Sequence, residues 1–155
     1  MNTYDLISIT NPYAELVLAL FLGVILGLER SFAKKTAGMR TYGLVSMGSC
    51  LFVIVGELLL PAYGHFSGMN PTALAANIII GIGFLGGGSI IHTGTHLSGL
   101  TTAAGLWIAA GIGIAVGFGY GFLATFATFL TLFAFTALWY FEHLITRDSK
   151  AKLDR

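Results

Sequence analysis

The chain has 155 residues, of which 55% are hydrophobic and only 10% are charged, and its net charge is +1. A soluble domain carries about 25% charged residues, so this composition excludes an ordinary soluble fold. The mean hydropathy of +0.82 instead favours a membrane protein. We expect the lipid bilayer as its main partner and no nucleic-acid partner.

Five apolar runs are long enough to cross a bilayer, which requires about 20 helical residues. They cover residues 12–29, 41–60, 72–91, 99–117 and 120–141. We therefore predict an all-α membrane protein, with one domain over residues 1–155 that forms a compact bundle of five transmembrane helices and ends in a tail at 142–155. No basic segment precedes the first run, which argues against a cleaved signal peptide.

The lysines and arginines fall in two places only. Four follow the first run and four lie in the tail: Arg30, Lys34, Lys35, Arg40, Arg147, Lys150, Lys152 and Arg155. With five spans, both places lie on one side of the membrane. The positive-inside rule then predicts that the N-terminus is outside and the C-terminus is cytoplasmic.

The third run contains the segment GIGFLGGG at residues 81–88. Glycine weakens a helix by about 1 kcal/mol relative to alanine, but small residues let membrane helices approach closely. On a helical wheel Gly83, Gly86 and Gly87 share one face, whereas Gly81 and Gly88 lie on nearly the opposite face. We predict that this helix is clamped between two close neighbours.

Other glycines repeat at a four-residue spacing, Gly23 with Gly27 and Gly113 with Gly117. They predict a tightly packed bundle. Five helices rarely cover so many packing faces alone, so we expect a homodimer. The alternative is that every such pair packs within one subunit.

Asn77 and His92 fall on the same helical face as Gly81 and Gly88, which makes a small and polar stripe along the third run. The interpretation that we favour is an interhelical hydrogen bond from Asn77 and an interfacial His92. The alternative is that the stripe forms one wall of a polar path across the membrane.

Ionisable residues within or beside the spans are the first candidates for a functional site. Glu29 and Arg30 end the first run, and Arg40 opens the second. Glu29 could pair with Arg40 across the hairpin that these runs form. The alternative is a plain interfacial ion pair that fixes the topology. Thr101 and Thr102 fall at the same predicted membrane face.

Neither a metal site nor a catalytic site is expected. His92 and His96 are four residues apart, but the loop context and the lack of a third ligand argue against zinc. No Asp or Glu lies at mid-bilayer, where a dedicated magnesium carrier would need oxygen ligands. The sequence has no nucleophile elbow or phosphate loop, so we expect no cofactor and no enzyme activity.

Four motifs resemble those of the MgtC/SapB family of bacterial inner-membrane proteins. They are GLER at 27–30, AGMRT at 37–41, GIGFLGGG at 81–88 and GLTTAAGLW at 99–107. The resemblance covers about residues 15–120. The motif positions that it carries over are Glu29, Arg30, Arg40, Thr41, Gly83, Gly86, Gly88, Thr101 and Thr102.

The resemblance implies a five-helix inner-membrane protein that is linked to magnesium homeostasis and to growth in low magnesium. It implies one of two activities. The first is regulation through contact with another membrane complex, such as the F-type ATP synthase. The alternative is a transporter or channel for magnesium or another small cation, with Asn77 on its path and Glu29, Arg30, Arg40, Thr41, Thr101 and Thr102 near its cytoplasmic gate.

Two departures from the family pattern bear on these expectations. The segment ALAAN at 73–77 replaces the family's RVAAQ, so that Ala73 stands for the arginine and Asn77 for the glutamine. The chain stops about 14 residues after its last predicted span, and it therefore resembles a short form without the C-terminal ACT-like domain. If the family's arginine contacts a partner or an ion, the first departure implies that this protein acts differently. The second departure implies that regulation by the C-terminal domain is absent, which weakens the transfer of the family's role in virulence.

Overall fold

The computed structural model describes residues 11–67 and 71–141. Its helices are α2 (Pro12–Phe32), α3 (Met39–Ser67), α4 (Pro71–Gly88), α5 (Leu100–Gly117) and α6 (Gly121–Phe133), and α6 continues into a π-helical turn, η1 (Ala134–Leu138). Five helices are long and apolar enough to cross a membrane, which confirms the predicted all-α membrane class. Within this set of five, α4 lies at the side and contacts α5 and α3.

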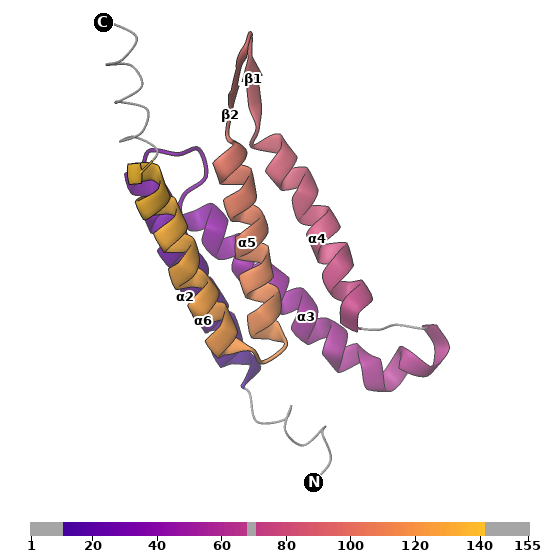
Figure 1. The fold of residues 1–155 in the computed structure, drawn as a ribbon. Helices are drawn as coiled ribbons and strands as arrows, with labels where there is room; N and C mark the ends of the chain where they lie inside the picture. Colours follow the sequence, from indigo (N-terminus) through magenta and orange to yellow (C-terminus); the bar gives the residue numbers. More distant parts are fainter. Residues whose placement is uncertain (1–10, 68–70, 142–155) are drawn as a thin grey trace, which may run out of the picture.

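The helices meet very unequally. α2 lies along α6 and α5, and α3 crosses behind them at an angle (Figure 1). The α2–α3 and α3–α5 contacts are the most extensive, whereas α4 touches mainly α5 and, to a smaller extent, α3. Figure 1 shows α4 standing beside the other helices rather than among them. The buried core therefore comes from α2, α3 and α5, with side chains such as Leu26, Tyr42 and Ile112.

The first helix begins where its sequence predicts. Asn11 caps it, because its side-chain oxygen accepts a hydrogen bond from the Tyr13 N–H at 3.0 Å. Pro12 follows at the first helical position, where its missing N–H removes no helix hydrogen bond. The predicted start of the first span at residue 12 is thus correct, although the helix continues three residues past the predicted end.

The predicted end of the third span at residue 91 is wrong. α4 stops at Gly88, and the chain continues as a hairpin of β1 (Ile91–Thr93) and β2 (His96–Ser98). The strands are antiparallel, with His92 opposite Leu97. Just past the last residue of α4, the Ser89 hydroxyl donates to the Gly86 carbonyl at 2.7 Å. Gly94 has a φ of +61°, which a tight two-residue turn needs.

The hairpin, the α2–α3 loop and the end of α6 all lie at the upper end of the molecule in Figure 1. Lys34 and Lys35 lie in that loop and Arg40 lies in the first turn of α3, and all three are exposed. We call this the basic end. Under the predicted orientation it faces the cytoplasm.

Candidate functional site

Arg30 is the most unusual side chain of the described segments, because it is a buried cation in the last turn of α2. Only 4% of its side chain is exposed. Its Nε atom donates to the Oε2 atom of Glu29, the preceding residue, and the two form an ion pair. The guanidinium group also lies over the Phe135 ring, 3.7 Å from the centroid, where the negative face of the ring stabilises the charge.

Two local features of the surrounding helices allow the Phe135 ring to lie close to Arg30. Phe135 belongs to the π-helical turn, and such turns re-aim side chains within a helix. On the facing α5, a methyl group added at Gly105 would lie 2.8 Å from the tip of the Phe135 ring and would overlap the Tyr42 hydroxyl. The Tyr42 hydroxyl donates to the Thr102 carbonyl at 3.3 Å. One contact cluster thus joins α2, α3, α5 and α6.

A cavity of about 1060 Å³ opens beside this cluster, between the end of α2, the start of α5 and the end of α6. Glu29, Arg30 and Lys35 contribute its charged lining, and Thr101 and Thr136 add hydroxyl groups. Apolar and aromatic side chains from α2 and α6 make up most of the rest. The cavity is large enough for a small organic ligand, and its charge is concentrated at one wall.

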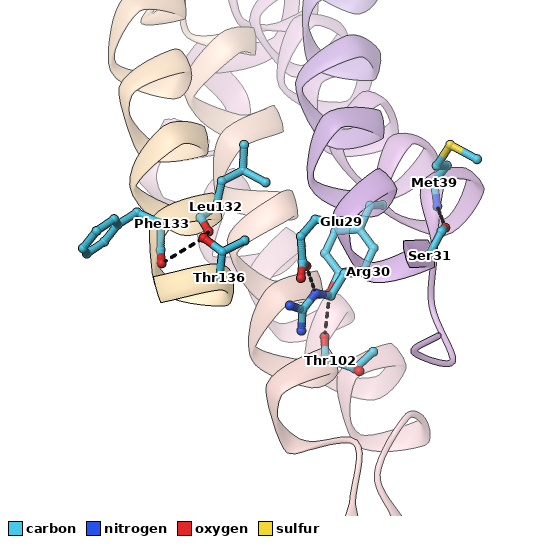
Figure 2. Close-up of polar contacts among 9 residues, drawn as sticks. Glu29, Arg30, Ser31, Met39, Thr102, Leu132, Phe133 and Thr136 are labelled. Atoms are coloured by element: carbon cyan, nitrogen blue, oxygen red, sulfur yellow. Dashed lines mark hydrogen bonds and ion pairs between the residues drawn. The ribbon is translucent and has the colours of Figure 1, made fainter. Parts of the chain in front are cut away.

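The structure brings together only some of the residues that the sequence analysis selected. Glu29, Arg30 and Thr101 line the same cavity. Thr102 is buried next to it, and its carbonyl accepts the Tyr42 hydrogen bond. These four positions form one site at the basic end, and Figure 2 shows three of them, Glu29, Arg30 and Thr102.

Arg40 and Thr41 do not belong to this site, because both are exposed in the first turn of α3. The expected pairing of Glu29 with Arg40 is wrong. Glu29 pairs with Arg30, its direct neighbour at the end of α2, and no ion pair of Arg40 is found in the described part of the chain.

Asn77 lies away from the basic end, on a second cavity of about 600 Å³ between α3 and α4. Ser49 and Gly81 share that cavity, whose lining is otherwise almost entirely apolar. The predicted helical stripe does not reach His92, because α4 ends before it and His92 lies on the hairpin. The polar stripe is therefore limited to Asn77 and its neighbouring glycines.

The glycines of α2 and α5 lie at close helix crossings. A methyl group added at Gly23 would lie 2.6 Å from the Tyr42 carbonyl oxygen, and one at Gly27 would lie 2.7 Å from the Gly38 oxygen. One at Gly117 would lie 2.7 Å from Val53, and one at Gly113 would overlap the Ser46 carbonyl. These four glycines let backbones come into contact.

The glycines of α4 behave differently. A methyl group added at Gly81, Gly83, Gly87 or Gly88 would meet nothing within 4 Å, and only Gly86 has a neighbour, Ala103, at 3.6 Å or beyond. The predicted clamp between two neighbours is therefore wrong within the described chain. Position on a helical wheel shows which residues share a face, but not whether a partner covers that face.

Sequence reasoning missed Tyr42, Gly105 and Phe135. Tyr42 follows the selected Arg40 and Thr41 directly, so the motif pointed to its neighbourhood. Gly105 lies inside the GLTTAAGLW motif but was not selected. Phe135 is one of 12 phenylalanines, and no local signal separates it from the others. In the described segments, no group of three or more His, Cys, Asp or Glu side chains is arranged to hold a metal ion.

Comparison with known proteins identifies relatives of most of the chain. The model of the MgtC family matches residues 16–144. An uncharacterised protein of Synechocystis is 45% identical over 89 residues, which cover 57% of this chain and 36% of the relative. The Escherichia coli protein YhiD, whose name describes a proposed magnesium transporter, is 38% identical over 101 residues, or 58% of this chain and 45% of the relative.

Protein MgtC of Salmonella typhimurium is 40% identical over 93 residues, which cover 59% of this chain and 37% of the relative. In each case the match spans less than half of the curated relative. No solved structure matches the chain. The family match extends over nearly all of the described helices and agrees with the five membrane-length segments. The chain therefore belongs to the MgtC family and is a multi-pass protein of the bacterial inner membrane.

Proposed function

We propose that the protein is a regulator in magnesium homeostasis that acts by contact with another inner-membrane complex. The observation that carries this proposal is the uncovered glycine face of α4. The magnesium link rests on family membership and on the name of the relative YhiD. The F-type ATP synthase, which the family resemblance implies, is the first partner to test.

The α4 face is arranged like a helix-packing surface without its partner. Gly83 and Gly87 have the four-residue spacing at which transmembrane helices pack most closely. Phe84 beside them is 85% exposed. Glycine lowers helix stability and gives no packing energy against lipid. A second helix along this face would supply the missing van der Waals contacts.

Bulky substitutions on this face should abolish partner binding while the fold persists. Gly83→Leu and Gly87→Leu place side chains where the chain itself has open space, so we expect the purified variants to keep the wild-type melting temperature. Cross-linking in native membranes, followed by mass spectrometry, measures the partner. We expect the cross-linked product to fall by about tenfold or more, because about 1.4 kcal/mol of lost contact corresponds to a factor of ten.

Gly111→Leu is the matched control, because Gly111 is also exposed with open space around it but lies on α5. It should leave the cross-linked product unchanged. A product that has twice the mass of the chain would identify a second copy rather than another complex. Equal cross-linking by wild type and both α4 variants would contradict the proposal.

The transporter reading is supported by a separate observation, the cavity between α3 and α4. Asn77 and Ser49 both line it, and amide and hydroxyl oxygens are suitable ligands for a hard cation. Glu29 is the one carboxylate among the lining residues of the other cavity, which makes it the residue to test at the basic end.

Magnesium flux into liposomes, followed with an ion-sensitive dye, tests this second function. If Asn77 lies on the path, Asn77→Leu should abolish the flux, whereas Asn77→Gln retains the amide and should preserve most of it. Glu29→Gln should reduce the flux at the basic end. Flux that is unchanged by all three substitutions would remove these residues from any transport path.

A further inference from the structure

The guanidinium group of Arg30 has hydrogen-bonding capacity that the protein does not use. Its Nε atom donates to Glu29, and Phe135 covers one of its faces. Its two terminal nitrogens have no hydrogen-bond partner among residues 11–67 and 71–141. In the described segments, Ser46 Oγ is the one fully enclosed side-chain nitrogen or oxygen without a partner, so the terminal nitrogens of Arg30 keep some access to their surroundings. A cation whose side chain is only 4% exposed, and which has two donors still accessible, is well placed to bind an anion.

The terminal nitrogens of Arg30 belong to a side chain that lines the cavity at the basic end. Arg30 is one of the lining residues of the cavity of about 1060 Å³. Figure 2 shows the terminal nitrogens pointing away from the α2 backbone, on the side of the helix that faces α6. The two terminal nitrogens of a guanidinium group form a planar fork that matches two oxygens of a phosphate or a carboxylate. An anion with such geometry fits this wall.

Two further positive features converge on the same wall. The Lys35 side chain lines the cavity, and the Lys35 N–H donates to the Arg30 carbonyl at 2.9 Å, which holds the loop against the end of α2. Thr101 also lines the cavity, and it lies in the first turn of α5. No side chain forms a capping hydrogen bond at this end of the helix. Uncapped N–H groups and the helix dipole attract anions. Two cations and a helix N-terminus thus oppose the single carboxylate of Glu29.

The rest of the cavity selects for a ligand with a hydrocarbon part. Leu28, Leu132 and Leu138 contribute to its lining. Phe32, another lining residue, is 83% exposed beside it. Basic pockets between transmembrane helices at the cytoplasmic face are suited to lipid headgroups.

We propose that this cavity binds the phosphate group of an anionic phospholipid. The Arg30 fork and Lys35 hold the phosphate oxygens near the start of α5, and the acyl chain follows the leucines of α2 and α6. This site is separate from the α4 face on which the proposed regulatory contact depends, so either proposal can fail without the other.

Native mass spectrometry of the detergent-solubilised protein tests the proposal with phosphatidylglycerol as the probe. Lys35→Gln should weaken binding by about fivefold, the usual contribution of one lysine near an anionic lipid. Lys34→Gln is the matched control, since Lys34 carries the same charge in the same exposed loop but does not line the cavity. It should change binding by less than about twofold, as expected for a charge outside the site.

Substitutions of the two residues of the ion pair should change lipid binding in opposite directions. Arg30→Lys keeps the charge but loses the fork, so binding should weaken by about tenfold. Glu29→Gln removes the competing carboxylate and should strengthen binding. If Arg30→Lys does not fold, the two loop variants decide the question alone.

Three results would overturn the proposal. The first is equal weakening by Lys34→Gln and Lys35→Gln, which would show only a general attraction to anionic lipid. The second is equally tight binding of phosphatidylcholine. The third is displacement of the lipid by inorganic phosphate at the same concentration, which would identify a site for free phosphate.

Discussion

Gly113→Ala should destabilise the protein strongly, although the change adds a single methyl group. That methyl group would overlap the carbonyl oxygen of Ser46 and lie 2.8 Å from its carbonyl carbon. Both atoms are backbone atoms of α3, so no side chain can rotate away. The α3–α5 crossing must open, and we expect a loss of about 3 kcal/mol, at the upper end of the cost of overpacking.

Gly111→Ala is the control two residues earlier on the same helix. A methyl group there meets nothing within 4 Å, and alanine favours a helix by about 1 kcal/mol over glycine. The two substitutions should therefore have opposite signs in a thermal unfolding assay of the purified protein. Equal melting temperatures for wild type and Gly113→Ala would show that α3 and α5 are not in backbone contact.

The number of helices could be predicted from the sequence, but the end of α4 could not. Five apolar runs were sufficient to predict five membrane-length helices, because hydropathy and length decide that question. Hydropathy could not predict the end of α4, since the apolar Ile90 and Ile91 continue the run into the hairpin. The boundary goes with the hairpin that follows, whose tight turn needs the positive φ of Gly94.

The glycine pattern was informative about faces but not about neighbours. Gly113 packs against backbone, whereas Gly83 is open, yet both lie in helices of similar composition. In the candidate site, Glu29 and Arg30 were identifiable because charge is rare in this chain. Phe135 was not, because a π-helical turn places it over Arg30, and no local pattern predicts such a turn.

Glu29→Gln should produce the second large effect, through Arg30. The Glu29 carboxylate is the charge partner of Arg30, and 19% of its side chain is exposed. Replacing it with a neutral amide leaves a buried guanidinium group without a counter-charge. Removing one partner of a buried ion pair costs about 3–5 kcal/mol, and the partial exposure of Glu29 places the expected loss near 3 kcal/mol.

The double variant Glu29→Gln with Arg30→Gln separates this effect from a simple loss of contacts. If the single variant is unstable because of an uncompensated charge, removing the charge as well should restore part of the lost stability. The melting temperatures of wild type, both single variants and the double variant complete a double-mutant cycle. Additive losses would mean that the two side chains act independently, and the ion pair would then not hold the basic end together. A recovery in the double variant would assign the stability of this end to charge compensation of Arg30 by Glu29.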